Sequence, residues 1–412
     1  MAAGLLGILA AVAIAFPWPA VRAGEPLSAF WVVWAAGMVL AQGFVVLKKG
    51  DPLLLPAAAG LSALGQVVLG RLGPPGLIFR QSVWLLVGLG FLWGALLLAR
   101  PAARLDRWRY TLAAAALGLV LLTFPLGAGA GARLWLDLGF FFIQPVEPLK
   151  LALALTLAGY LAERRELLYY ARRRLGPLVL PATTYLIPLG VVTGLALLLL
   201  FAQRDLGSAL LVLGVAVGSL YAAAPRPAHL ILGLVPAAVA AAGGYLLNPV
   251  VQERVHVWLD PWADPEGRGF QVAQALIALA AGGAGGTGLG LGRPDLVPAV
   301  RTDFVFVALG EELGFLGTAG AVGLYLVLLA RCFRLGLLAR SEYNRLLAVT
   351  LGLTLGVQTF IILAGTVRLM PLTGLTVPFI SYGGSSLVVN YAILGLLAAL
   401  SVEEETGQRC GC

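Results

Sequence analysis

Apolar runs long enough to cross a membrane recur along the whole chain, and they constrain its fold more than any other feature. An α-helix needs about 20 apolar residues to span the hydrocarbon core of a bilayer. Hydrophobic residues make up 60% of the 412 residues, and charged residues make up only 12%. Soluble domains carry about 25% charged residues. The sequence therefore predicts an all-α polytopic membrane protein.

Twelve segments qualify as membrane-spanning helices by length and hydropathy. They are residues 3–21, 28–47, 53–71, 81–99, 109–127, 147–162, 178–202, 206–224, 228–247, 306–330, 346–366 and 384–400. No basic residue precedes the first of them, which favours a membrane helix over a cleaved signal peptide. The segment 178–202 contains Pro181 and Pro188, and these predict a kink.

Basic residues collect in alternate loops between the predicted spans. With twelve spans both termini lie on one side of the membrane, and the loops and tail on that side hold 17 of the 28 basic residues. Short cytoplasmic loops carry the excess of Lys and Arg in membrane proteins. Both termini are therefore predicted to be cytoplasmic. The net charge of +8 then reflects membrane topology, and we expect no nucleic-acid partner.

Residues 248–305 form the longest segment outside the predicted spans, and the charge pattern places this long loop on the outer, extracellular side. Long loops are usually either functional or disordered. The aromatic residues Trp258, Trp262 and Phe270 favour an ordered, functional segment. The apolar stretch 272–281 is predicted to lie along the membrane surface.

Polar residues mark the outer ends of several predicted spans. Gln144, Glu147 and Lys150 share one helical face. Lys150 there either only neutralises Glu147 or forms with it the wall of a headgroup site. Asp205 is placed to cap the helix that follows it, and a capping role leaves room for a second role facing a cavity. Trp135 is an interfacial anchor or a platform for a substrate, and composition favours the anchor.

Three acids accompany the return of the chain into the membrane after the long loop. Asp303 lies at the mouth of the apolar run beside Arg301, whose charge is expected to reduce the cost of the carboxylate. Glu311 and Glu312 lie about two helical turns deeper. A carboxylate in hydrocarbon is costly, so the two glutamates should face the bundle interior and pair with cations or backbone. We expect a structural polar network at Glu311 and Glu312, and we select Asp303 as the candidate catalytic residue.

A second outer segment, "RLMPLTGLTVPFISYGGSS" at 368–386, is broken by prolines and glycines. Non-helical backbone at membrane depth is tolerated only where it is buried in protein or lines a wet cavity. The segment therefore predicts a cavity on the outer side, facing the long loop. The glycine-rich stretch 282–298 lacks a Walker lysine and Rossmann spacing, and two histidines cannot build a histidine-based metal cluster. We expect no organic cofactor.

The motifs of the outer segments resemble those of the SEDS family of cell-wall polymerases, the group of RodA and FtsW, and they occur in the family's order. They are "GARLW", "QPVE", "QRDLGSA", "LDPWADPEGRGFQ", "GTGLGLG", "TDFVFVALGEELGFLG" and "PLTGLTVPFISYGGSS". The resemblance covers residues from about 53 to 400. The family core has ten membrane helices, which implies a SEDS core at 51–400, two additional N-terminal helices at 1–50 and a cytoplasmic tail at 401–412.

The resemblance also implies an activity. Members polymerise lipid II, an undecaprenyl-linked disaccharide pentapeptide, at the outer face of the bacterial cytoplasmic membrane in elongation or division. They work beside a class B penicillin-binding protein, and membrane lipid surrounds them. Asp303 matches the family's essential outer-loop aspartate, and a divalent cation, Mg2+ or Mn2+, is a candidate cofactor. The expected substrate-binding residues are Arg133, Trp135, Glu147, Lys150, Asp205, Arg254, Gln271, Arg301, Thr302, Ser381, Ser385 and Ser386. Outward cations for the pyrophosphate also include Arg204 and Arg368.

Several positions depart from the family pattern. Ala299 stands where many relatives have Glu, and Arg301 stands where a histidine is common. Val146 replaces a serine, and Ile362 replaces a common asparagine. Two other functions stay open at this point. A lipid II flippase would use the same outer segments without needing Asp303 as a base, and a non-catalytic scaffold would only recruit a transpeptidase.

Overall fold

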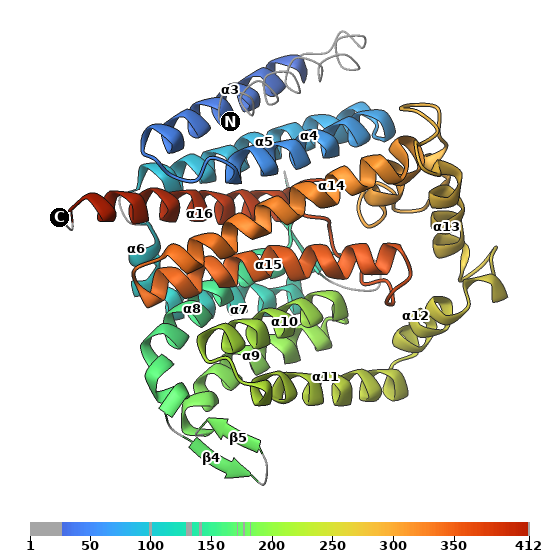
Figure 1. Ribbon diagram of the computed structural model, residues 1–412. Helices are drawn as coiled ribbons and strands as arrows, with labels where there is room; N and C mark the ends of the chain where they lie inside the picture. Colours follow the sequence, from blue (N-terminus) through green and yellow to red (C-terminus); the bar gives the residue numbers. More distant parts are fainter. Residues whose placement is uncertain are drawn as a thin grey trace. The chain divides into compact units, whose positions relative to one another are not determined.

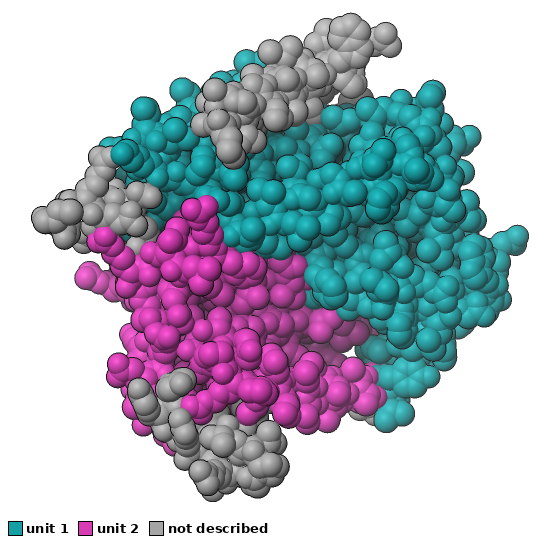
Figure 2. Space-filling model, viewed as in Figure 1, with its two compact units in different colours: residues 1–97, 245–331, 358–412 teal, residues 98–244, 332–357 magenta. Residues whose placement is uncertain are grey.

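The computed structural model describes residues 27–98, 101–128, 134–139, 142–170, 172–175, 178–181 and 183–410. It divides into two compact units, which Figure 2 shows in different colours. Unit 1 comprises residues 1–97, 245–331 and 358–412, and unit 2 comprises residues 98–244 and 332–357. The unit boundaries fall within three helices. The predicted first span, 3–21, and Arg133 lie outside the described residues.

Unit 1 holds the first described helices, the long segment 248–305 and the last helix (Figure 1). Its helices are α3 (Leu27–Leu47), α4 (Leu54–Leu72), α5 (Pro75–Leu97), α12 (Pro249–Leu259), α13 (Phe270–Gly282), most of α14 (Val305–Leu338) and α16 (Gly384–Cys410), with the 3-10 helices η1 (Pro261–Ala263) and η2 (Pro294–Leu296).

Unit 2 is also mainly helical and carries two small sheets. Its helices are α6 (Pro101–Arg107), α7 (Arg109–Leu126), α8 (Val146–Tyr170), α9 (Thr183–Ala202), α10 (Leu206–Ala223), most of α11 (Pro227–Leu247) and most of α15 (Glu342–Thr366). The antiparallel strands β1 (Gly127–Ala128), β2 (Trp135–Asp137) and β3 (Phe142–Ile143) form one sheet, and β4 (Arg172–Leu175) pairs with β5 (Leu178–Pro181) in the other.

Ten helices of the described chain are long and apolar enough to cross a membrane, and they coincide with ten of the twelve predicted spans. The predicted segment 147–162 is also helical, within α8, but charged residues near both ends of its apolar stretch keep it out of that set. The predicted start of the segment 178–202 was wrong. Residues 178–181 form β5, and α9 begins only at Thr183, after Pro181, with Pro188 inside it.

Close helix contacts hold the core of unit 1 together. A Cβ atom on Gly395 of α16 would lie 2.8 Å from the Cα of Leu92 on α5, so glycine is what lets these two helices approach. The buried Tyr391 hydroxyl accepts a hydrogen bond from Trp34 Nε1 of α3 (2.9 Å) and shares another with Ser62 Oγ of α4 (2.9 Å). Small residues and interhelical hydrogen bonds are the usual means by which helices associate in lipid.

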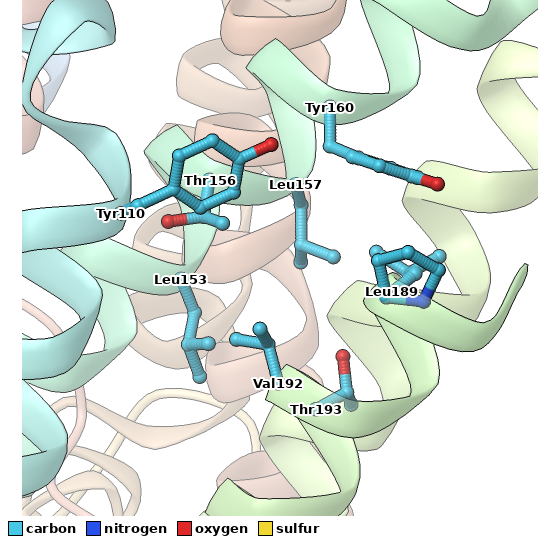
Figure 3. Close-up of a pocket in the computed structure, with 9 residues that line it drawn as sticks. Tyr110, Leu153, Thr156, Leu157, Tyr160, Leu189, Val192 and Thr193 are labelled. Atoms are coloured by element: carbon cyan, nitrogen blue, oxygen red, sulfur yellow. The ribbon is translucent and has the colours of Figure 1, made fainter. Parts of the chain in front are cut away.

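The core of unit 2 is an apolar cluster of side chains from α7, α8, α9 and α10, among them Val120, Leu149 and Leu200. A small pocket opens among α7, α8 and α9 (Figure 3). Its lining residues are Tyr110, Leu153, Thr156, Leu157, Tyr160, Pro188, Leu189, Val192 and Thr193. None of these described lining residues is a carboxylate, an imidazole or a cation.

The long segment 248–305, predicted to be extracellular, is ordered, as its aromatic residues predict. Asn248 caps α12 by accepting a hydrogen bond from the backbone N–H of Val250 (3.0 Å). The side chain of Asp264 accepts from the backbone N–H groups of Gly267 and Arg268, both at 3.0 Å. Such caps and turns satisfy backbone groups that would otherwise be free. They fix the course of the chain from α12 through α13 to the start of α14.

Candidate active site

Asp303 lies in a tight turn that leads into α14. The carbonyl oxygen of Ala299 accepts hydrogen bonds from the backbone N–H groups of Thr302 (3.0 Å), Asp303 (3.1 Å) and Phe304 (3.3 Å). Ala299 itself has a φ of +54°, a left-handed conformation that costs a residue with a Cβ free energy. The turn therefore fixes Asp303 just before the apolar helix starts at Val305.

The non-helical segment between α15 and α16, residues 367–383, lies against this turn. A Cβ atom on Gly374, whose φ is +77°, would lie 3.7 Å from Oδ2 of Asp303. Ser381 Oγ donates a hydrogen bond to the carbonyl oxygen of Thr302 at 2.5 Å. These contacts place the broken segment against the end of the long loop within unit 1, while the cavity predicted there stays a prediction.

The surroundings of Asp303 change its acidity. Burial raises the pKa of the Asp303 carboxyl to about 6, because desolvation disfavours its charged form. A hydrogen bond from the Thr302 side chain and the positive charge of Arg254 act in the opposite direction and lower the pKa in part. A carboxylate with a pKa near 6 is mostly ionised at neutral pH and is still basic enough to accept a proton. It is therefore suited to general-base catalysis.

The cation whose charge acts on Asp303 is not its sequence neighbour Arg301. Arg301 was expected to offset the charge of Asp303, but its Nε donates to the carbonyl oxygen of Leu72 (2.9 Å), at the end of α4. The last carbonyls of a helix attract cations. The charge that acts on Asp303 comes from Arg254 of α12, whose Nη1 also contacts the carbonyl oxygen of Leu372 (3.5 Å).

Three further predicted residues, Gln271, Ser385 and Ser386, also lie in unit 1. Ser386 Oγ accepts a hydrogen bond from the Thr376 hydroxyl (2.9 Å), and Ser385 beside it is buried. Gln271 of α13 donates to the carbonyl oxygen of Pro298 (3.4 Å). Unit 1 thus contains Arg254, Gln271, Arg301, Thr302, Asp303, Ser381, Ser385 and Ser386. Their contacts with a substrate stay a prediction.

The two glutamates of α14 form a structural polar network, as predicted. Both are buried. Glu312 pairs with Arg71 of α4 (3.5 Å), and Glu311 Oε1 accepts a hydrogen bond from the backbone N–H of Arg293 (2.7 Å). Sequence reasoning missed Arg71. Its one signal was a lone cation at the outer end of the predicted span 53–71.

The glycine-rich stretch after α13 is the backbone half of this network. The N–H of Thr287 donates to the carbonyl oxygen of Glu311 (2.9 Å), and the N–H of Gly288 donates to that of Glu312 (3.0 Å). These carbonyls are available because Gly314, with a φ of +68°, interrupts the regular helix two residues later. The glycines therefore allow the backbone of this stretch to pack closely against α14. This packing explains them without a phosphate ligand.

The remaining predicted residues lie in unit 2. Glu147 and Lys150 form a buried ion pair of 2.6 Å. Asp205 caps α10 by accepting hydrogen bonds from the N–H (3.0 Å) and the hydroxyl (2.7 Å) of Ser208. Trp135 lies partly buried in β2. The predicted pairing and capping roles are confirmed, while binding roles for these residues stay predictions.

Comparison with known proteins assigns the family. A family model described as "Cell cycle protein", covering the FtsW, RodA and SpoVE group, matches residues 62–406. The chain belongs to the SEDS family. Among curated SEDS relatives, the peptidoglycan glycosyltransferase RodA of Mycobacterium tuberculosis is 38% identical over 368 residues. The match covers 85% of this chain and 78% of that one.

Solved SEDS structures share the fold of this chain. A structure described as structural coordination of polymerization and crosslinking by a peptidoglycan synthase complex matches with a TM-score of 0.73 and 36% identity. It covers 86% of this chain and 98% of the other. The rod shape determining protein RodA of Thermus thermophilus matches with a TM-score of 0.63 and 33% identity, over 86% of this chain and 97% of its own. These matches bear out the all-α membrane fold expected from the sequence.

Proposed function

We propose that this SEDS protein is a peptidoglycan glycosyltransferase that polymerises lipid II, with Asp303 as the general base. Relatives over most of its length carry that enzyme name. The observation that carries the residue assignment is the position of the Asp303 carboxylate. Asp303 lies outside the apolar helix, on an ordered turn. The positive charge of Arg254 acts on the carboxylate, and Gly374, which has no side chain, lies beside it.

The proposed reaction needs one proton acceptor and one site for developing negative charge. The 4-hydroxyl oxygen of one sugar forms a bond to the anomeric carbon of another, and the bond from that carbon to the lipid pyrophosphate breaks. The electron pair leaves with the pyrophosphate, and the hydroxyl proton moves to the Asp303 carboxylate. A positioned base typically contributes about 10²- to 10⁴-fold to such a rate.

The leaving pyrophosphate needs positive charge from the protein. Arg254 is the best-supported candidate for this positive charge. It lies in the long segment 248–305, and its charge acts on Asp303, the proposed proton acceptor. Cationic groups aimed at developing negative charge stabilise a transition state strongly when water is excluded. A guanidinium also matches phosphate oxygens with paired N–H donors.

A divalent cation fits this site only together with the substrate. Among the described residues there is no group of three or more His, Cys, Asp or Glu side chains that could hold a metal ion. Mg2+ often binds through substrate phosphates and retained waters, with only one or two protein carboxylates. We therefore propose that Mg2+ or Mn2+ arrives with the pyrophosphate, where it would neutralise charge on the leaving group.

The expected partner is a class B penicillin-binding protein, which cross-links glycan strands. Its support is the similarity to a structure of a complex that couples polymerization and crosslinking. The ten apolar helices make the chain a multi-pass membrane protein. The proposed arrangement in the bacterial cytoplasmic membrane has both termini in the cytoplasm and Asp303 facing outward, where the sugar substrates are found.

The deciding experiment is polymerisation of lipid II by the purified protein in detergent, with and without Mg2+ or Mn2+ and with the transpeptidase added. Wild type is expected to make glycan strands, and Asp303→Asn is expected to lose at least about 10²-fold in rate. Asp295→Asn is the matched control, since Asp295 is an exposed acid of the same outer segment. Transport of lipid II across proteoliposomes without any strands would instead support a flippase.

A further inference from the structure

Three hydrogen bonds between Trp258, Leu259 and Arg368 join the end of α12 to residues 367–383. Trp258 Nε1 donates a hydrogen bond to the carbonyl oxygen of Arg368 (3.1 Å). In return, Arg368 Nε donates to the carbonyl oxygen of Trp258 (2.7 Å), and its Nη2 donates to that of Leu259 (2.5 Å). We call these three hydrogen bonds the α12 clasp. They connect residues about 110 positions apart in the sequence.

The α12 clasp provides hydrogen-bond donors for free carbonyl groups at the C-terminal end of α12. The last carbonyl groups of an α-helix have no partner within the helix. The Arg368 guanidinium satisfies two of them with a fork of N–H donors that lysine cannot reproduce. Arg368 also has a φ of +61°, a left-handed conformation that persists in a non-glycine residue only when its surroundings fix it. The backbone there is held in place by the clasp.

The same helix carries the cation of the candidate active site. Arg254 precedes Trp258 by four residues, so the two side chains share one face of α12. Arg254 Nη1 contacts the carbonyl oxygen of Leu372, and its charge acts on Asp303. Gly374, which borders Asp303, follows two residues after Leu372. The clasp and Arg254 therefore hold the same two segments, one helical turn apart.

We propose that Arg368 is a positioning residue, which sets Arg254 against Asp303 and the substrate pyrophosphate by fixing α12 to residues 367–383. The proposal rests on the proposed glycosyltransferase function. It gives Arg368 a role other than direct pyrophosphate binding, because two of its N–H groups already bind helix carbonyls. Its effect on catalysis then passes through Arg254.

This route through Arg254 makes a specific kinetic prediction. Arg368→Gln removes the fork and is expected to slow polymerisation roughly 10- to 100-fold, the scale of a misplaced catalytic group. Arg254→Gln is expected to lose at least as much. The double variant should be no slower than Arg254→Gln alone, because Arg368 has nothing left to position. Independent effects would instead multiply.

A second measurement tests the clasp without activity. Hydrogen–deuterium exchange of amides 256–260, at the C-terminal end of α12, should accelerate in Arg368→Gln and, to a smaller degree, in Trp258→Phe, which loses only the indole donor. Arg268→Gln is the matched control, because Arg268 is an exposed arginine of the same outer segment with one long contact to Glu253 (3.9 Å). Its exchange and its polymerisation rate are expected to equal those of wild type.

The outcomes separate this proposal from the proposed function. If wild type makes no glycan strands under any condition, the glycosyltransferase function fails and the positioning role fails with it. If wild type is active while the losses in the double variant multiply, or while Arg368→Gln exchanges like Arg268→Gln, only the positioning role is overturned. Faster exchange in α12 together with non-multiplying losses supports it.

Discussion

At the scale of single residues, Asp303 combines a useful acidity with a cost in stability. Its pKa of about 6 lies above the ordinary value of 3.8, so the folded protein holds that proton more tightly than the unfolded chain does. The stabilisation of the folded state by the proton is therefore complete below about pH 3.8 and lost as the pH rises through about 6. At neutral pH, Asp303 is therefore mostly an ionised, partly desolvated carboxylate. This is the state that a general base requires.

The rate of polymerisation should follow the ionisation of Asp303. Since the base must be deprotonated, we expect the rate of the wild type to rise about tenfold per pH unit below pH 6 and to level off above it. The measurement is the initial rate between pH 5 and 8 at fixed lipid II and detergent. Asp295→Asn should show the same profile as wild type. A rate that stays flat from pH 5 to 7 would contradict the assignment of Asp303 as the base.

Gly374 borders Asp303, and its backbone conformation is one that disfavours a side chain. A Cβ atom there would contact Asp303 Oδ2 at 3.7 Å, and the φ of +77° is one that side-chain-bearing residues rarely adopt. Gly374→Ala is therefore expected to cost about 1–2 kcal/mol of backbone strain and to lower the polymerisation rate. Gly320→Ala is the control, because nothing lies within 4 Å of a Cβ built at that position of α14. Equal rates for both variants would show that Gly374 tolerates a side chain.

At the scale of elements, the glycine-rich stretch matters through its contact with α14. A Cβ atom on Gly282 would overlap the carbonyl oxygen of Gly310, whereas one on Gly285 would meet no atom within 4 Å. We expect Gly282→Ala to lower the thermal stability of the detergent-solubilised protein by several degrees, and Gly285→Ala to leave it close to wild type. Thermal unfolding followed by size-exclusion chromatography measures both. Equal stability of the two variants would contradict tight packing of this loop.

The helices themselves follow from physics that acts within one segment. Length and hydropathy are enough to locate ten apolar spans, because backbone groups in lipid must be satisfied inside the helix. The error at 178–181 has a local cause, since Pro181 cannot donate a backbone hydrogen bond and the helix begins after it. The prediction of twelve spans also included α8, whose buried ion pair and charged end give it a weaker apolar signal.

The acidic residues of the candidate site can be recognised from the local sequence, whereas their cationic partners cannot. The expense of a carboxylate near hydrocarbon points to Asp303, Glu311 and Glu312 from sequence alone. Their partners depend on tertiary contacts that no periodicity reveals. Arg71 reaches Glu312 from more than 200 residues away, and Arg254 takes the place expected for Arg301. Sequence distance hides such pairs, because they depend on how segments pack.

At the scale of the whole molecule, the predicted residues are shared between the two compact units. Unit 1 carries Asp303 and the outer segments that hold it, and unit 2 carries the Glu147–Lys150 pair and the Asp205 cap. The predicted division into an N-terminal pair of helices, a core and a tail follows the family resemblance instead and stays a prediction. Both divisions place Asp303 and Arg254 in the same part of the chain.

The orientation of the chain in the membrane is open to a direct test by cysteine labelling. Cys410 and Cys412 are replaced by serine, and the buried Cys332 is kept. Leu296→Cys, at an exposed position of the outer segment, should react with a membrane-impermeant maleimide on intact spheroplasts. Lys48→Cys, in an exposed turn between α3 and α4, should react only after permeabilisation, since the positive-inside rule places that turn in the cytoplasm. The reverse pattern would put Asp303 on the cytoplasmic side and exclude glycan synthesis at the outer face by this residue.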